Sequence, residues 1–306
     1  MAQRGAALLT ALLIVAVAVT LTAGMMAAQH LEIRSSGNLL DRDRALQYAL
    51  GGEGWAMGIL TRDASEGPTD HLNEPWATAL PAIAVGGGTI AGGIRDLQGL
   101  FNLNNLLLDG KQSPEDFARF TRLLRVVGLE SRLAAAVVDW IDADDRVSGP
   151  GGAEEGSYYG KQPGYRPANQ FFVTATELRQ VEGFTGEAVA LLLPLVTALP
   201  ERTELNINTA PVELLMTLVE NMPKADAMAL DGKRQQDKGY TNVNDLLNDP
   251  LLKGKTVLSG GLGVASHYFL LEQEVRLGRG RTRLASLLLR KEGGVRVLRR
   301  AQGGVL

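Results

Sequence analysis

The stretch that decides the fold runs from Ala6 to Ala28 and reads AALLTALLIVAVAVTLTAGMMAA, 23 consecutive residues without a charge. As an α-helix rising about 1.5 Å per residue, it covers the roughly 30 Å hydrocarbon core of a bilayer. Only residues 1–5 precede it, and Arg4 is the one charged side chain among them. Because positive charge favours the cytoplasmic side, we predict a single-pass segment with the C-terminal bulk of the chain across the membrane.

Three interpretations of this segment compete. A cleaved signal peptide has a shorter apolar stretch, about 7–15 residues, followed by a small-x-small cleavage site, and Met26-Ala27-Ala28 matches such a site poorly. An uncleaved signal anchor fits the length. In the third interpretation the chain is cut after Arg4-Gly5, before the apolar run, so that the run stays in the mature protein. We favour the third.

The helical pattern continues beyond the apolar run. An apolar stripe recurs there with spacings of 7, 4 and 7 residues, at Leu39, Leu46, Leu50 and Met57. Such spacing is typical of one helix face, and charged residues, Glu53 among them, fill the other faces. We predict one rod from Ala6 to about Leu60, stopped by DASEGP at 63–68; the alternative is a membrane anchor followed by a separate amphipathic helix.

Composition limits what the rest of the chain can be. Of the 306 residues 45% are hydrophobic and 21% charged, the formal net charge is −3, and there is no cysteine. These values indicate a globular protein and argue against nucleic acid or an anionic membrane surface as its main partner. The lack of cysteine excludes disulfides, thiol catalysis and Cys-ligated metals. His30, His71 and His267 lie far apart, so no catalytic residues are predicted.

The chain after the rod has strand-like ends and a helical centre. Residues 69–92 contain prolines and Gly86-Gly87-Gly88 and are interpreted as loop and short strand, and residues 93–106 as a first strand. Ser113-Pro114 begins a helical pattern that lasts to about Leu252. Alternation with period two returns from His267, with further strands at 282–289 and 295–298. This order favours an α+β fold, a long helix on an antiparallel sheet, with an all-α domain inserted.

A weak repeat lies within the helical centre. Val126-Val127-Gly128-Leu129 and Val181-Glu182-Gly183-Phe184 each precede an apolar helix, and residues 218–222 form a possible third copy without glycine. Such units are similar to helix-hairpin-helix motifs, which often bind DNA phosphates. Acidic residues surround them and would repel phosphate: Glu130, Glu182 and Glu187. We therefore interpret the hairpins as packing units and predict no nucleic-acid partner.

The N-terminus resembles a class III, type IV prepilin-like leader, which a prepilin peptidase cuts after glycine before the new amino terminus is methylated. The resemblance implies cleavage between Gly5 and Ala6 and N-methylation of Ala6. Pilins of this kind carry Glu at the fifth mature position, thought to pair with the amine of a neighbouring subunit, and here that position is Thr10. Because a buried unpaired charge is costly, the missing carboxylate suits a subunit with no neighbour ahead of it.

Several motifs resemble those of the minor pseudopilin K family of type II secretion: DLQGLFNLNNL at 96–106, DWIDADD at 139–145, GAEE at 152–155 and LNINTAP at 205–211. The resemblance implies a type IV pilin-like core containing an inserted α-helical domain with helix-hairpin-helix-like repeats. We divide the chain accordingly into a leader at 1–5, a transmembrane and filament helix at 6–28, core at 29–112, inserted domain at 113–262 and C-terminal core strands at 263–306.

The resemblance also implies a function. The chain would be a minor pseudopilin of the inner membrane that initiates and caps the tip of the periplasmic pseudopilus. Its partners would be minor pseudopilins I and J, then H and the major pseudopilin, with prepilin peptidase and the inner membrane; secreted substrates are further candidates. The alternative function is a membrane-anchored, extracytoplasmic helix-hairpin-helix protein that binds DNA, as in competence systems.

An acidic cluster is the candidate metal site. Asp139 and Asp142, three residues apart, share a predicted helix end, and further acids follow across a Gly/Pro-rich loop. Oxygen ligands on a flexible loop suit Ca²⁺, although Arg146 at a ligand position excludes an EF-hand; the alternative is a solvated acidic loop. The resemblance adds weight to structural Ca²⁺, with four candidate ligands: Asp142, Asp144, Glu154 and Glu155.

Overall fold

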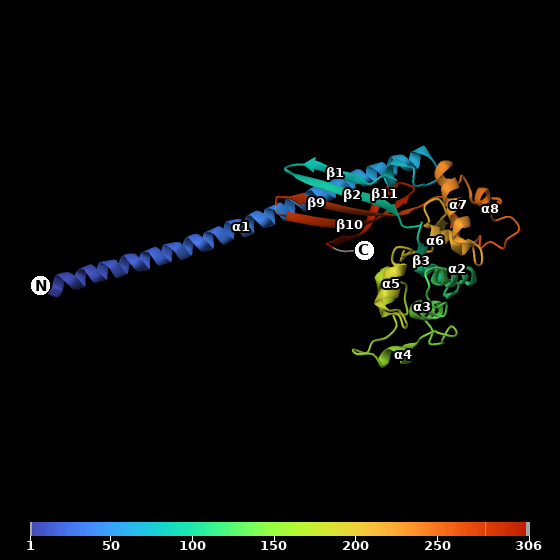
Figure 1. Cartoon of the computed structure of the whole chain (residues 1–306), viewed down its shortest axis with the longest axis horizontal. Coiled ribbons are helices and arrows are strands. Elements are labelled where there is room, and N and C mark those ends of the chain that lie inside the picture. The colour runs from blue at the N-terminus through green and yellow to red at the C-terminus, as the bar shows by residue number, and fades with distance from the viewer. Residues whose placement is uncertain (1, 279, 304–306) are drawn as a thin grey trace.

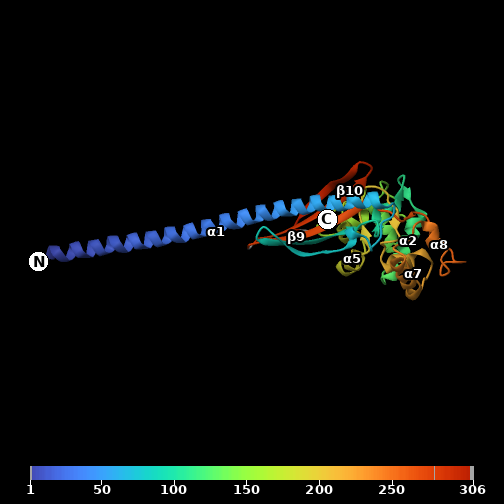
Figure 2. The same ribbon diagram turned by 90° about the horizontal axis from the view of Figure 1, so that it is seen from above.

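The computed structural model describes residues 2–278 and 280–303. Its longest element is α1 (Ala2–Glu66), a continuous helix of 65 residues. The N-terminal part of α1 projects away from the remainder of the molecule, which gathers at the other end (Figures 1 and 2). The predicted single rod is confirmed. It ends just before Gly67-Pro68, where proline can neither donate a helical hydrogen bond nor fit inside a helix.

The second half of α1 lies on a five-stranded antiparallel sheet. Its strand order is β1-β2-β9-β10-β11, so two N-terminal strands pair with three C-terminal strands across a long insertion. The strand bounds are β1 (Leu80–Val85), β2 (Gly88–Asp96), β9 (Tyr268–Leu277), β10 (Gly280–Lys291) and β11 (Gly294–Gln302). The three predicted C-terminal strands are confirmed, each with longer bounds than the sequence indicated.

The face of α1 that meets the sheet is made of small residues. Ala45 and Ala49 are fully buried against Val275 and Leu284, and Ala56 is buried farther along. The buried face of α1 is therefore rotated about the helix axis from the apolar stripe that the sequence predicted. Its leucines at 46 and 50 flank the contact, and Leu39 remains 59% exposed. Alanines lie at the centre because they let the helix backbone approach the strands closely.

A carboxylate also lies on this buried face. Glu53 is 4% exposed, and it accepts hydrogen bonds from the Ser286 hydroxyl on β10 (2.6 Å) and from the Arg300 guanidinium on β11 (2.7 and 2.8 Å). The sequence placed Glu53 off the apolar stripe of α1, but in the structure Glu53 lies on the face that packs on the sheet. Burial opposes its ionisation, but the hydrogen bonds from Arg300 and Ser286 hold the pKa of Glu53 below its ordinary value.

The segment at 69–106 is organised differently from the prediction. A short 3₁₀ helix (Pro75–Ala77) leads into the β1–β2 hairpin, and Gly86 and Gly87 form its two-residue turn with φ of 47° and 88°. Glycine favours such positive φ values in tight hairpins, so the glycine run predicted to be a flexible loop is a β-turn. The predicted strand at 93–106 ends at Asp96.

The insertion between β2 and β9 forms a helical block at the far end of α1 (Figure 1). Its helices are α2 (Pro114–Val126), α3 (Leu133–Ile141), α4 (Glu155–Tyr159), α5 (Gly186–Leu192), α6 (Val212–Leu215), α7 (Lys224–Gln236) and α8 (Val243–Leu247), with 3₁₀ turns at Leu103–Leu106, Ala175–Gln180 and Met216–Leu218. Three pairs of two-residue strands accompany them: β3 (Phe101–Asn102) with β6 (Val196–Thr197), β4 (Leu107–Leu108) with β5 (Lys111–Gln112), and β7 (Leu205–Asn206) with β8 (Leu262–Gly263).

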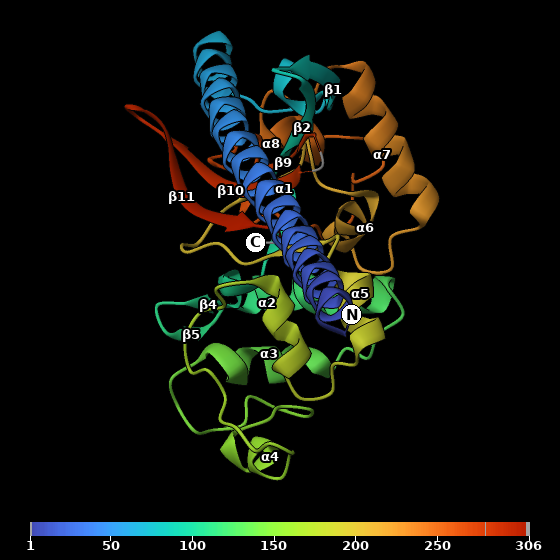
Figure 3. The same ribbon diagram turned by 90° about the vertical axis from the view of Figure 1, so that its left-hand side faces the viewer.

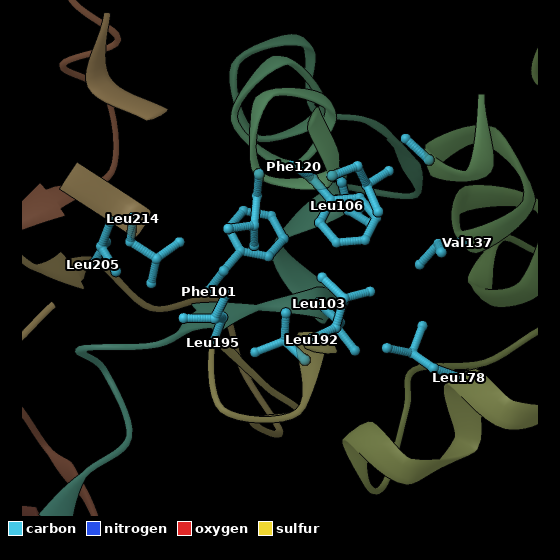
Figure 4. Packing of buried hydrophobic residues seen from close by; sticks show 14 of the residues in the cluster. Phe101, Leu103, Leu106, Phe120, Val137, Leu178, Leu192, Leu195, Leu205 and Leu214 are labelled. Atoms are coloured by element: carbon cyan, nitrogen blue, oxygen red, sulfur yellow. The ribbon is translucent and has the colours of Figure 1, made fainter. Parts of the chain in front are cut away.

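This block has its own hydrophobic core. Phe101 stacks on Phe120 of α2 with ring centroids 5.3 Å apart, and side chains from α3, α5 and α6 close around them (Figure 4). Phe101 and Leu103 follow directly after the sheet strand β2, yet they pack in this core. The chain therefore passes from sheet to helical block near residue 97.

The repeated hairpins within the block share one backbone feature. Gly128 after α2 and Gly183 after the turn at Ala175–Gln180 both have positive φ, 78° and 82°. In the third copy Asn221 has the corresponding conformation, with φ of 53°. Asparagine is one of the few residues that tolerate this left-handed region, which explains a repeat without its glycine.

The sheet and the helical block are joined by buried polar side chains. Asp96, at the end of β2, accepts hydrogen bonds from Asn206 (3.0 Å), Ser266 (2.7 Å) and Thr209 (2.5 Å). Gln98 accepts from the backbone N–H of His267 at 2.6 Å. The DLQG and LNINT motifs of the sequence thus meet at one junction, and their polar residues connect the two parts of the molecule.

Candidate functional site

The first candidate site is the stem, the part of α1 from Leu8 to Leu40. Its side chains are exposed, and the large apolar ones from Leu8 to Met26 are 50–70% exposed. By length and composition, α1 is the helix of the described chain that can cross a membrane. Thr10 lies on this stem. Gly5 and Ala6, the predicted cleavage site, belong to α1 but lie outside the residues whose side chains are described.

The second candidate site is the acidic loop at residues 142–154, which follows α3. Asp139 is fully buried on α3 and closes the loop on itself. Its Oδ1 accepts from the backbone N–H of Ser148 (2.8 Å) and its Oδ2 from that of Ala153 (2.7 Å). A Cβ at Gly152 would collide with Oδ2. Asp139 therefore shapes the loop from within, a role for which the only sequence signal was an acid inside an apolar helix.

Two carboxylates of this loop have buried oxygen atoms without a hydrogen-bond partner in the described chain. Asp142 is 8% exposed, and its Oδ1 has no hydrogen bond within the described chain; the same holds for both carboxylate oxygens of Glu154. Burial, and then the charges of Asp139 and Asp144, raise the pKa of Asp142 to about 6. Burial and the surrounding aspartates raise the pKa of Glu154 to about 7. Unsatisfied buried oxygens of this kind fit a hard cation such as Ca²⁺.

The remaining predicted ligands lie at the edge of this pair. Asp144 is exposed and accepts from the backbone N–H of Arg146 at 2.8 Å. Glu155, at the start of α4, forms an ion pair with Arg166 at 2.8 Å. The structure thus brings the carboxylates of Asp142 and Glu154 close together and leaves Asp144 near them on the surface. Glu155 is turned toward Arg166 instead.

Another acidic cluster lies where α1 ends. One carboxylate oxygen each from Asp63, Asp70 and Glu74 lies within 4.8 Å of the others. Arg290 of β10 fills this position, because its guanidinium donates to Asp63 at 2.6 Å and also to Asp70. The chain's own guanidinium therefore offsets the charges of Asp63 and Asp70. Sequence reasoning missed this pairing because Arg290 is more than 200 residues from both aspartates.

The basic C-terminal strands are largely paired within the chain. Arg276, Arg281 and Arg283 surround Glu274, and their hydrogen bonds lower the pKa of Glu274 to about 2. Lys291 pairs with Glu201, and Arg290 and Arg300 are paired as described above. These contacts favour basic residues paired within the chain over a surface for an acidic partner.

A first helix with a free apolar stem, packed through its second half on a small antiparallel sheet, defines a pilin-like subunit. Here the sheet is interrupted by a large helical block between its second and third strands in chain order. Figure 3, viewed along α1 from its N-terminus, shows the helix crossing the sheet with this block beside it.

Comparison with known proteins gives the family. Two family models described as type II secretion system, protein K match residues 99–201 and 205–265. Type II secretion system protein K of Pseudomonas aeruginosa is 37% identical over 99% of this chain and 94% of its own length, and that of Aeromonas hydrophila is 33% identical over 99% and 98%. The chain belongs to the type II secretion system protein K family, a structural component of that machinery.

The fold comparison agrees. The crystal structure of the GspK-GspI-GspJ complex from enterotoxigenic Escherichia coli contains a chain that superposes with a TM-score of 0.75 at 27% identity, covering 86% of this chain and 97% of that one. The predicted pilin-like class and the minor pseudopilin family are thereby confirmed. Membership of this family favours the pseudopilin interpretation over the competence-like one.

Proposed function

We propose that this chain initiates and caps the tip of the periplasmic pseudopilus in type II secretion. The apolar run Ala6–Ala28 anchors it in the inner membrane before assembly and packs among neighbouring stems afterwards. Minor pseudopilins I and J are its first partners, followed by H and the major pseudopilin. A relative solved as a GspK-GspI-GspJ complex supports minor pseudopilins I and J as partners. The chain acts by assembly in this proposal and carries no catalysis.

The position of the helical block carries the proposal. The block lies at the end of α1 that is opposite the stem, beside the helix and partly beyond its last turn (Figures 1 and 3). In this proposal the stem anchors the chain in the membrane, so later subunits would meet the stem side and the block would face the free end. A further subunit stacked beyond this chain would have to occupy the volume of the block. That conflict favours a terminal position.

The identity of residue 10 supports the same position. The fifth residue after the proposed cleavage is Thr10, where pilin-like subunits within a filament have a carboxylate. A carboxylate in the filament interior needs the amino terminus of the adjacent subunit as its partner, since an unpaired buried charge is costly. A neutral threonine at this position does not need the amino terminus of an adjacent subunit as a partner.

The test is the substitution Thr10→Glu in the full chain, with labelled copies located on isolated pseudopili. We expect wild-type label at one end only, and Thr10→Glu label also along the shaft. Thr22→Glu, on the same stem, is the control for a carboxylate as such and should not enter the shaft. Wild-type label distributed along the shaft would contradict the capping role.

We also propose that the acidic loop binds Ca²⁺ as a structural ion. Asp142 and Glu154 would supply the central ligands, with Asp144 beside them, while Asp139 holds the loop closed. Glu155 is the weakest member of the predicted set because its carboxylate pairs with Arg166. A bound cation would offset the repulsion among these acids and the cost of burying Asp142 and Glu154.

Calcium titration of the purified chain tests this second proposal. If Ca²⁺ is present at about a hundred times its dissociation constant, the folded state should gain about 2.7 kcal/mol, seen as a rise in Tm. Glu154→Gln should abolish the rise, and Glu155→Gln should keep most of it. A Tm that does not respond to Ca²⁺, or a response that Glu155→Gln removes and Glu154→Gln preserves, would refute the assignment.

A further inference from the structure

A small pocket lies where the sheet meets the helical block, on the face of the sheet opposite α1. Its volume is about 100 Å³, and we call it the sheet–block pocket. Its floor is a row of four residues that pair directly across four strands: Arg95, Leu270, Leu287 and Arg299. Directly paired residues of neighbouring strands point to the same face of a sheet. Two leucines therefore lie between two arginines.

The helical block forms the roof of this pocket with short side chains. The roof residues are Thr174, Thr176, Thr197 and Ala198, together with Leu193. Because most of them are short, they leave the apolar floor incompletely covered. An unfilled apolar cavity costs stability, since the atoms that line it lose contact partners. A ligand with an apolar body would therefore stabilise the chain by entering the pocket.

The charge of the pocket is positive. Within the described chain its lining contains two arginines and no carboxylate. Arg299 donates from Nη1 to the Val173 carbonyl at 2.9 Å, but its Nε is buried and has no hydrogen-bond partner among the described residues. A buried donor without an acceptor costs free energy. The pocket therefore suits a ligand that supplies an acceptor to Arg299.

The next residue of the chain shows which acceptor fits. Arg300 points to the other face of the sheet, where its Nε and Nη2 donate to the two carboxylate oxygens of Glu53 at 2.8 and 2.7 Å. This edge of a guanidinium matches the spacing of the oxygens in a carboxylate. Nε of Arg299 belongs to the corresponding edge. A carboxylate is therefore the acceptor that its geometry favours.

The size and lining of the pocket restrict the rest of the ligand. A cavity of about 150 Å³ holds a benzene-sized molecule, so the smaller volume here suits an aliphatic body of about four carbons. An inorganic phosphate would bring charge without covering Leu270 and Leu287, and would lose its hydration against an apolar lining.

We propose that the sheet–block pocket binds a carboxylate carried on a short aliphatic body. The carboxylate pairs with Arg299, and the aliphatic body covers Leu270 and Leu287. Arg95, which is exposed, adds positive charge at the rim. A free branched acid and a leucine at the end of a polypeptide share this chemistry. Because the floor belongs to the sheet and the roof to the helical block, the bound ligand holds the two parts together.

The first test follows the Tm of the full-length chain in non-ionic detergent, at pH 7.5 and constant ionic strength, during titration with isovalerate. The Tm should rise to saturation. Isovaleramide, which has the same body without the charge, should leave it unchanged, and acetate should require at least tenfold higher concentrations. No rise with isovalerate, or an equal rise with isovaleramide, would overturn the inference without any substitution in the chain.

Substitution of the two arginines is the second test. Arg299→Gln should weaken isovalerate binding at least tenfold, and Arg95→Gln at least threefold. Arg296→Gln is the matched control, because Arg296 is an exposed residue of the same strand as Arg299 and does not line the pocket; it should bind as wild type does. Wild-type affinity in either pocket variant would contradict the inference. If Arg299→Gln does not fold, Arg95→Gln decides.

The third test locates the ligand and distinguishes its two sources. The photoreactive carboxylate 4,4-azipentanoate should label β9, β10 or residues 193–198, and labels confined to other segments would refute the site. A Tm rise with the peptide acetyl-trialanyl-leucine, absent with its C-terminal amide, would assign the pocket to a polypeptide end. A rise with isovalerate alone would assign it to a free acid, and either result supports the inference.

Discussion

Glu53 illustrates how one residue fixes the position of the long helix. Its carboxylate is buried on α1 and is held by Ser286 and Arg300 from two neighbouring strands. Alanines on either side of it allow close contact but offer no direction, since apolar packing is not directional. The hydrogen bonds to Glu53, together with the one from Gln273 of β9 to the Ala49 carbonyl (2.7 Å), therefore set the register of α1 along the sheet.

Replacing this carboxylate tests its contribution. Glu53→Gln should lower the free energy of unfolding by about 1–3 kcal/mol at pH 7, because the charge-assisted hydrogen bonds from Arg300 are lost. The pKa of Glu53 is depressed in the folded state. Its stabilisation is therefore complete above the unfolded pKa, about 4.5, and is lost as the pH falls through the lower folded pKa.

Chemical unfolding of wild type and Glu53→Gln at several pH values measures this directly. The difference between them should be largest at pH 7 and shrink in acid. Glu292→Gln, at an exposed turn, serves as the control and should change stability by less than about 0.5 kcal/mol. An equal difference for Glu53→Gln at all pH values would show that packing, not charge, is responsible.

At the scale of elements, the sequence predicted which segments are helices and strands better than it predicted which of their faces are buried. The apolar run, the long rod and the three C-terminal strands followed from length and periodicity. The buried face of α1 did not, because alanine and glutamate carry little hydrophobic signal and their burial depends on the sheet. The β1–β2 hairpin was missed because prolines and glycines resemble loop composition, while pairing with β9 decides its structure.

The candidate sites also differ in how much of each could be predicted from the sequence. The acids of the loop at 142–154 are close in sequence and were found, but only the folded chain distinguishes buried Glu154 from Glu155 beside it. The cluster of Asp63, Asp70 and Arg290 and the sheet–block pocket join segments far apart in the chain. Neither has a local sequence signal.

The ion cluster at the end of α1 provides a prediction at this scale. Arg290 is 11% exposed and ties β10 to α1 through Asp63 and to the following loop through Asp70. Arg290→Met should destabilise the chain by about 3–5 kcal/mol at pH 7.5, because it leaves two buried carboxylates uncompensated. Burial already raises the pKa of Asp63 to about 6.

Because protonation relieves an uncompensated carboxylate, the cost of Arg290→Met should decrease between pH 7.5 and pH 5. Equilibrium unfolding at both values measures it. Arg296→Met is the control, since Arg296 is exposed and its side chain makes no ion pair among residues 280–303. A loss of less than 1 kcal/mol, or one that grows in acid, would refute this account of the junction.

At the scale of the whole molecule, the chain combines two units with different surroundings. The helical block buries its own hydrophobic core and joins the sheet through buried polar side chains. The stem exposes apolar side chains along its length and needs a bilayer or other stems to cover them.

All of this requires that the stem remain in the mature protein. Mass spectrometry of the mature N-terminus, on chain isolated from the membrane and from pseudopili, measures this most directly. We predict a protein that begins with N-methylated Ala6 in both fractions. A mature chain beginning at Gln29 would have lost the anchor, the filament helix and Thr10, and would contradict the account.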